Sequence, residues 1–313
     1  MKGYNEKLEK LLDFKGMEVP DHIPQGDMPR DPVWIGPEVT AKANTLFPLV
    51  VKELINIEGK AVISIAGGSG VGKTCIASLF TYYLNANGIG AYTLSGDNYP
   101  RRIPEYNDAE RLHIYREAAT KGLVASGNYT KENMEILLHL QEENLDSDPK
   151  QFDSYPWMKD YFEAGKLGLK GYLGTGNEIC FSDINNVLKQ FKEGKDKIWL
   201  KRMGRTETSL WYEEKDFSNI QVIVVEWTHG LSNELNDVDV PILLNSTPEE
   251  TLQARIARGR DANADTPFIA MVLAIEQRKL HSQAPNAKLI LSKAGKIISY
   301  KEYYEAMKEL DHD

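Results

Sequence analysis

The chain has 313 residues, of which 42% are hydrophobic and 27% charged, and its formal net charge is -9. This length suits one large α/β domain or a core domain with an added element. An acidic balance without a long basic run argues against broad electrostatic binding to nucleic acid or to an anionic membrane. Two cysteines, a charged start and no apolar run long enough to span a bilayer predict a cytoplasmic protein.

The first part of the chain is predicted to be an arm followed by a helix. Residues 7–14 show a short helical pattern, and a proline-rich, irregular run follows as far as Pro37. Apolar residues at helical spacing then predict a helix over 40–57 that leads into a strand. We therefore expect residues 1–58 to form an N-terminal arm and helix.

A strand beginning at Ala61 runs into GGSGVGKT, which matches the GxxxxGK[ST] pattern of a phosphate-binding P-loop. Its glycines allow backbone N–H groups to point at phosphate oxygens, and the helix predicted from Lys73 adds the positive end of its dipole. Lys73 is expected to reach the outer phosphates, and the Thr74 hydroxyl to bind Mg²⁺. The residues expected to bind the nucleotide are Gly68, Ser69, Gly70, Val71, Gly72, Lys73, Thr74 and Cys75.

Strands and helices alternate after the P-loop. Strands are predicted at 91–97, 198–203, 222–227, 240–245 and 288–292. Helices are predicted at 108–120, 131–144, 155–164, 181–193 (with Ser182 as N-cap) and 248–281. This alternation, with the P-loop, predicts an α/β P-loop NTPase fold, a mostly parallel sheet with helices on both faces. We expect residues 59–102 and 171–313 to form the core, and 103–170 to be an inserted helical cap over the substrate.

Two acidic residues follow predicted strands. Asp97 could accept the proton of an attacking hydroxyl or hold the metal through water, although Gly-Asp-Asn is also ordinary turn chemistry. Glu226 follows four apolar residues, and an acid in that position is expected to have a cation or donor beside it. Because ligands gather beyond the carboxyl ends of parallel strands, we expect Gly67, Asp97 and Glu226 to face one pocket.

Basic residues follow in two further groups. Arg255, Arg258 and Arg260 could fold over the phosphates as a lid, or could lie on a solvated helix face paired with nearby acids. The residues expected to contact the phosphoryl acceptor are Tyr99, Arg101, Arg102, Arg202 and Arg205. The basic residues at the end of the strand at 198–203 and just after it, Lys201, Arg202 and Arg205, could equally be ordinary surface residues.

Five motifs occur in a recognisable order: GGSGVGKT, GDNYP, FSDINNVLKQFKEGK running into IWLKR, VIVVEWTHG and ARIARGRD. Together, over about residues 60–293, they resemble the uridine kinase/phosphoribulokinase family. The resemblance implies a kinase that phosphorylates a hydroxyl of a small metabolite with ATP and Mg²⁺, and it suggests a homodimer.

The same resemblance implies a role for each matching residue. Lys73 and Thr74 would hold phosphate and metal, Asp97 would be the base, and Glu226 would lie in the metal shell. The remaining matches would be the lid arginines, Arg255, Arg258 and Arg260, and Arg205 near the acceptor.

The acceptor stays open between a nucleoside, a sugar, a sugar phosphate and a hydroxy acid. The helical stretch at 103–170 is longer than in a typical uridine kinase, and the residues after Asp97 and around Arg202 do not reproduce its nucleoside-binding pattern. The alternatives are another P-loop transferase of the adenylylsulfate-kinase type, a regulatory P-loop NTPase, and a P-loop module that binds nucleotide without catalysis.

Overall fold

The structure is a computed structural model that describes residues 2–24, 26, 35–204, 209–258 and 266–311. Its chain divides into two compact units, which we describe separately. The first contains residues 1–99, 180–254 and 277–313, and the second contains residues 100–179 and 255–276. The predicted insertion at 103–170 falls inside the second unit, which also holds the region of the predicted arginine lid.

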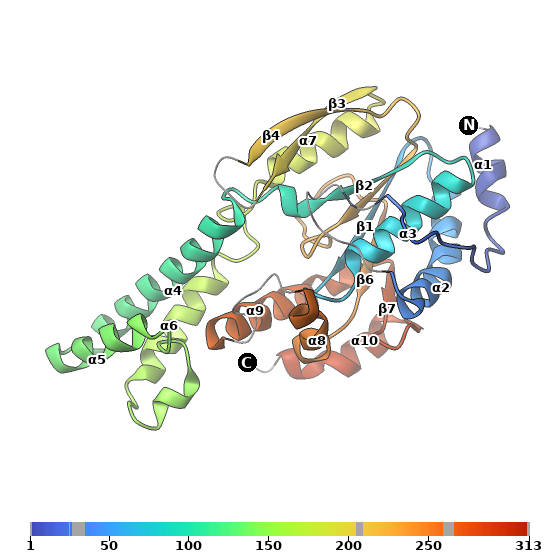
Figure 1. Ribbon diagram of the computed structural model, residues 1–313. Helices are drawn as coiled ribbons and strands as arrows, with labels where there is room; N and C mark the ends of the chain where they lie inside the picture. The colour runs from blue at the N-terminus through green and yellow to red at the C-terminus, as the bar shows by residue number, and fades with distance from the viewer. Residues whose placement is uncertain (1, 25, 27–34, 205–208, 259–265, 312–313) are drawn as a thin grey trace. The chain divides into compact units, whose positions relative to one another are not determined.

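The first unit is built on a six-stranded sheet in the order β2-β5-β1-β6-β7-β8 (Figure 1). Its strands are β1 (Ala61–Gly67), β2 (Ala91–Ser95), β5 (Val222–Glu226), β6 (Val240–Leu244), β7 (Leu289–Leu291) and β8 (Ile297–Ile298). All neighbouring strands are parallel except β7 and β8, which are antiparallel. The predicted α/β fold with a mostly parallel sheet is confirmed.

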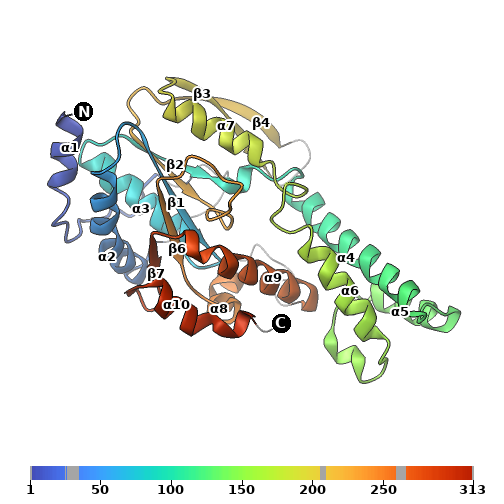
Figure 2. The ribbon, with the colours of Figure 1, turned by 180° about the vertical axis from the view of Figure 1, so that it is seen from behind.

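Helices cover both faces of this sheet because alternate residues of the buried strands point in opposite directions. On one face, Ile63 and Ile65 pack with α2 (Pro37–Leu54) and α3 (Lys73–Ala86). On the other face, Ala66 packs with α10 (Tyr300–Met307) and with the end of α9 (Pro267–Gln283) (Figure 2).

A separate two-stranded antiparallel ribbon, β3 (Lys197–Met203) and β4 (Leu210–Asp216), also belongs to the first unit. It packs on α7 (Phe181–Lys192) through the buried side chains of Ile198 and Leu200. The sequence did not predict β4, because four charged residues in a row follow its first three residues and no polar–apolar alternation appears.

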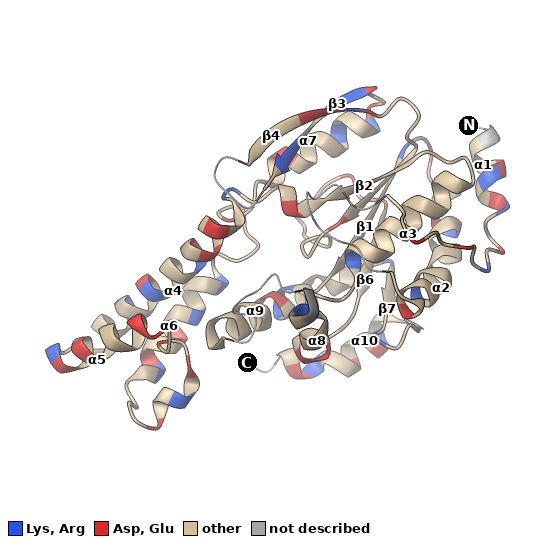
Figure 3. Cartoon of the chain, viewed as in Figure 1, with Lys and Arg blue, Asp and Glu red and all other residues tan. Residues whose placement is uncertain are grey.

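The second unit is mainly helical. It contains α4 (Pro104–Ser126), α5 (Lys131–Glu142), α6 (Met158–Lys170) and the first part of α9, whose apolar residues share one core. Small residues bring α4 and α6 close together: a Cβ on Gly168 would lie 2.3 Å from the Cβ of Ala118. Basic and acidic residues are interspersed along these helices (Figure 3).

Several predicted boundaries were wrong. The helix expected at 7–14 is α1 (Lys2–Glu9); the apolar pattern continues beyond it in turns such as the bond from Leu11 N–H to the Leu8 carbonyl. The strand expected at 91–97 ends at Ser95, and a 3₁₀ turn follows. Cys180, not Ser182, is the N-cap of α7, because its N–H bonds to the Tyr99 carbonyl and fixes the chain before the helix.

The helix predicted at 248–281 is two helices. The first is α8 (Pro248–Arg258), and the second is α9. The residues between them, 259–265, lie outside the described part of the chain. Within that described part, no helix combines the length and apolar character that a bilayer crossing requires.

Candidate active site

The P-loop has the backbone conformation that its glycines predict. Gly70 and Gly72 have φ values of 81° and 98°, which residues with a side chain rarely adopt. At Gly67 a Cβ would lie 2.6 Å from the carbonyl oxygen of Leu244, so the close approach of β6 also requires glycine. The residues from Gly68 to Cys75 are all partly exposed, as a loop that binds a ligand must be.

Lys73 begins α3 directly after this loop. Its Nζ donates to the carbonyl oxygens of Gly67 and Gly68, at 3.0 Å each, and therefore folds back over the loop. Thr74 Oγ1 donates to Glu226 Oε2 at 2.9 Å, so the P-loop helix and the end of β5 are joined at this point.

Glu226 is the buried carboxylate of the site. It is 3% exposed and accepts hydrogen bonds from Thr74 and from the Ser95 hydroxyl. Burial, and to a smaller extent the negative charge of Asp97, raise its pKa to about 7 against the opposing effects of Ser95, Lys73 and Thr74. A carboxylate that is costly to ionise in the unliganded protein is a suitable partner for a cation.

Asp97 is the one exposed residue of the 3₁₀ turn Gly96–Asn98, which follows β2. The turn is fixed from two sides. A Cβ on Gly96 would lie 2.0 Å from Trp227 Cγ, so the indole ring lies directly against this glycine. Buried Asn98 accepts a hydrogen bond from Met203 N–H at 3.0 Å through its Oδ1. The neighbours of Asp97 are thus held while its carboxylate faces outward.

Sequence reasoning missed three residues of this site: Ser95, Asn98 and Trp227. Ser95 could have been found, because it is the last residue of β2 and pairs in register with Glu226. Asn98 and Trp227 act through tertiary contacts with the turn, and nothing in the local sequence indicates them.

Three of the predicted site residues with described side chains belong to the second unit. Arg101 Nε donates to the Gly176 carbonyl at 2.5 Å. Arg102 bonds to the Tyr172 hydroxyl at 3.0 Å and pairs with Glu110 at 3.2 Å. Arg255 is 5% exposed. Their expected contacts with acceptor or phosphates stay predictions.

Of the remaining candidates, Tyr99 and Arg202 are buried in the first unit, at 1% and 3% exposure. The Arg202 guanidinium bonds to Glu213 at 3.1 Å and to the Tyr92 hydroxyl at 2.8 Å, so it ties the β3–β4 ribbon to β2. The side chain of Arg258 and all of Arg205 and Arg260 lie outside the described residues.

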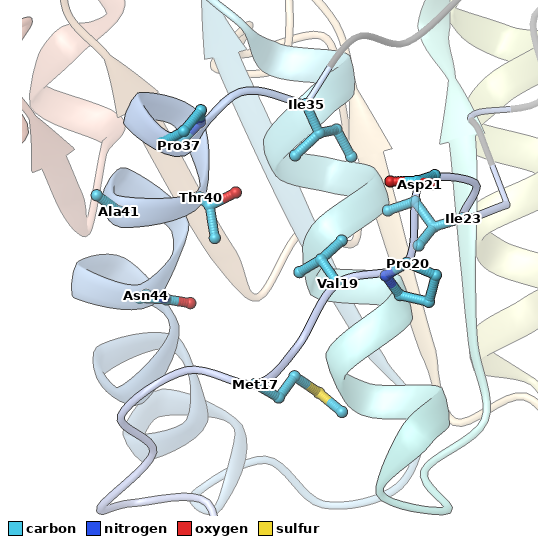
Figure 4. Close-up of a pocket in the computed structure, with 10 residues that line it drawn as sticks. All are labelled: Met17, Val19, Pro20, Asp21, Ile23, Ile35, Pro37, Thr40, Ala41 and Asn44. Atoms are coloured by element: carbon cyan, nitrogen blue, oxygen red, sulfur yellow. The ribbon is translucent and has the colours of Figure 1, made fainter.

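The first unit also has a cavity of about 570 Å³ between the N-terminal arm and α2 (Figure 4). Its walls include Val19 and Ile23 from the arm and Thr40 from the helix, and none of the predicted site residues lines it. Across the described residues, no group of three or more His, Cys, Asp or Glu side chains is placed to bind a metal. A cation bound at Glu226 would therefore need further ligands, which Thr74 and a bound nucleotide could supply.

No family model matches the chain. It is 42% identical over 242 residues to the bifunctional alpha-galactosidase/sucrose kinase AgaSK of Mediterraneibacter gnavus. The match covers 77% of this chain and 21% of that protein, so the chain spans about a fifth of the length of this relative. The predicted resemblance to kinases is confirmed by this similarity.

Solved structures with a similar arrangement have low identity. A D-glycerate 3-kinase from Cryptococcus neoformans is 9% identical, with 85% of this chain and 99% of that chain covered and a TM-score of 0.48. A possible uridine kinase from Bacillus stearothermophilus is 15% identical, with 78% and 96% covered and a TM-score of 0.39. Likenesses at this level carry no inference about activity.

Proposed function

We propose that the chain is an ATP-dependent kinase that transfers a phosphoryl group to a hydroxyl of a sugar, with sucrose as the first acceptor to test. The observation that carries the proposal is the junction of Lys73, Thr74 and Glu226 at the P-loop, with Asp97 on the adjoining turn. The sugar is suggested by the relative whose name includes a sucrose kinase.

The residues fit Mg²⁺. Thr74 Oγ1 and the Glu226 carboxylate are oxygen donors 2.9 Å apart, and Mg²⁺ is bound by oxygen ligands, usually one or two carboxylates together with phosphates. The ion would neutralise charge on the phosphate oxygens when bound. Burial of Glu226 makes its ionised form depend on such a neighbour.

The protein's own groups supply positioning and charge. The P-loop N–H groups and Lys73 would hold the triphosphate, and Lys73 would leave its two carbonyl partners to do so. Asp97 would take the proton of the attacking hydroxyl, because it is the exposed carboxylate beside this end of the sheet. Arg255, Arg258 and Arg260 are proposed to stabilise charge on the transferred group.

The test is ADP release with sucrose, other sugars, sugar phosphates, nucleosides, hydroxy acids and adenylylsulfate as acceptors, and with no acceptor. We expect release that depends on a sugar and is lost in Lys73→Ala, whereas the exposed-lysine control Lys52→Ala keeps it. ADP release that requires adenylylsulfate would instead identify a nucleotide kinase. ADP release that is equally fast without any acceptor would identify an NTPase.

The expected acceptor contacts of Tyr99, Arg101, Arg102, Arg202 and Arg205 stay outside this mechanism until an acceptor is found. A homodimer is also a prediction, and the mass of the protein in solution tests it.

A further inference from the structure

The β3–β4 ribbon carries a concentration of exposed apolar side chains that the proposed mechanism does not use. Trp199, Leu210 and Tyr212 are 58%, 49% and 57% exposed. The register pairs Trp199 with Glu214, Lys201 with Tyr212 and Met203 with Leu210, so all three apolar residues point to the same face. The opposite face carries Ile198 and Leu200, which are buried, and Trp211, which is 44% exposed.

The backbone of β4 is also available for pairing along one edge. Bonds from Gly204 N–H to the Ser209 carbonyl and from Phe217 N–H to the Asp196 carbonyl mark both ends of the ribbon as hydrogen-bonded pairs. Because such pairs alternate along an antiparallel ladder, the odd-numbered residues of β4 bond to β3. Leu210, Tyr212 and Glu214 therefore direct their N–H and C=O groups away from β3, and these groups have no hydrogen-bond partner among the described residues.

An exposed edge of this kind is usually blunted by charge. Three of the four charged residues of β4 are paired within the ribbon: Glu213 with Arg202 at 3.1 Å and with Lys215, and Glu214 with Lys197 at 3.5 Å. The fourth, Asp216 at the end of the strand, accepts a hydrogen bond from Ser218 N–H. The middle of β4 therefore presents paired charges and exposed aromatic residues, a surface that suits another strand as its partner.

We propose that β4 pairs antiparallel with β4 of a second copy of this chain, which joins the two ribbons into one four-stranded sheet. Three registers pair five or more residues of the seven-residue strand, with a two-fold axis through Tyr212, Glu213 or Glu214. A two-fold axis at Glu213 or Glu214 would place this glutamate directly opposite the same glutamate of the second copy, and facing like charges destabilise a strand pair. The axis at Tyr212 opposes tyrosine to tyrosine, Leu210 to Glu214 and Trp211 to Glu213, with no like charges facing each other.

In this register the apolar residues form one stripe across the joined sheet. Tyr212 of each copy lies at the centre, and Trp199 lies diagonally behind it on each β3. The inference names the surface of the predicted homodimer and does not depend on kinase activity, so it can fail or hold independently of the proposed function.

Mass in solution gives the first test. Light scattering at tens of micromolar is expected to give twice the 35.3 kDa of one chain. Glu214→Pro removes an N–H that points away from β3 and is expected to give monomers, whereas Glu214→Gln, which loses the same charge but keeps the N–H, stays dimeric. A monomeric wild-type protein, or a dimer unchanged by Glu214→Pro, overturns the proposal.

Cysteine crosslinking tests the register. Tyr212→Cys is expected to give a disulfide-linked dimer on oxidation and Glu214→Cys is not, with the unsubstituted chain run beside them to control for Cys75 and Cys180. Crosslinking through position 214 in place of 212 overturns the proposed axis. If the protein is a monomer and Tyr212→Ser weakens sugar binding, the exposed face of the ribbon binds the acceptor. That result would also overturn the proposed dimer.

Discussion

The P-loop and two of the arginines predicted to contact the acceptor are held by different kinds of interaction. Ser95 and Glu226 meet because neighbouring parallel strands end at the same edge of one sheet, and Thr74 in the first turn of α3 bonds to Glu226. Arg101 and Arg102 belong to the helical unit, where their partners are Gly176, Tyr172 and Glu110. A site at the ends of strands can be located from the sequence, because the predicted strands fix where each one ends. The surroundings of an arginine in a helical unit depend on side-chain contacts that the sequence does not reveal.

The largest expected effect comes from the strand-end region. Asp97→Asn removes the proposed base and should lower kcat by about a thousandfold to ten-thousandfold. Nucleotide affinity, measured by fluorescence titration, should be retained because Lys73 and Thr74 are intact. The exposed variant Asp13→Asn serves as control, and an active Asp97→Asn enzyme would remove Asp97 from the mechanism.

In the helical unit, Arg111→Met should lower stability by about 4 kcal/mol, because it leaves Glu178 buried without its cation. Arg111 pairs with Glu178 at 2.6 Å and with Glu276 at 3.5 Å, and the Glu178 side chain is 2% exposed. Hydrogen exchange should show the loss across residues 100–179, while nucleotide binding by the first unit persists.

The matched control for this pair is Lys121→Met, which removes an exposed partner of Glu117 in the same unit. Its effect on stability should be much smaller than that of Arg111→Met, because solvent screens an exposed ion pair. Equal losses in the two variants would show that the Arg111 pair does not hold this unit together.

Glu226→Gln should change how stability depends on pH in the absence of nucleotide and magnesium. The pKa of Glu226 is about 7 in the folded chain against 4.5 for an ordinary glutamate, so between these values the folded state holds a proton that the unfolded state has released. Stability of the wild type therefore falls as pH rises through this window, by roughly 3 kcal/mol at most, and levels off above it.

Urea unfolding at pH 5 and pH 8 measures the difference. In Glu226→Gln the free energy of unfolding should no longer fall between pH 5 and pH 8 through this group, so the variant should be more stable than the wild type at pH 8. Glu193→Gln, which changes an exposed glutamate, is the control. Identical slopes for the wild type and Glu226→Gln would contradict the assigned pKa.

The smallest of these effects concerns the turn that carries Asp97. Gly96→Ala should lower kcat by about a hundredfold, because the added Cβ meets the Trp227 ring and displaces the turn. Trp227→Ala removes the ring, so the double variant should be no slower than Trp227→Ala alone. Gly176→Ala is the control, since a Cβ there meets nothing within 4 Å. Additive losses would show that the contact does not position Asp97.

These two regions also show how far the sequence predicts the molecule. The P-loop, the end of β5 at Glu226 and the place of Asp97 shortly after β2 were predicted, because a spacing pattern and buried apolar runs determine them locally. The β4 strand, the break between α8 and α9, and the partners of Arg102 and Arg202 were not predicted. The arginine partners include residues far along the chain, Tyr172 for Arg102 and Tyr92 for Arg202, and β4 forms by pairing with β3. Local periodicity carries no information about these contacts.

The raised pKa of Glu226 has a consequence for calorimetry. Near pH 7 this carboxyl is only partly ionised before a ligand arrives, and a cation with a triphosphate beside Thr74 favours the ionised form. Binding then releases a fraction of a proton to the buffer. The heat of titration should therefore differ between Tris, which has a large ionisation enthalpy, and phosphate, and the difference should disappear in Glu226→Gln.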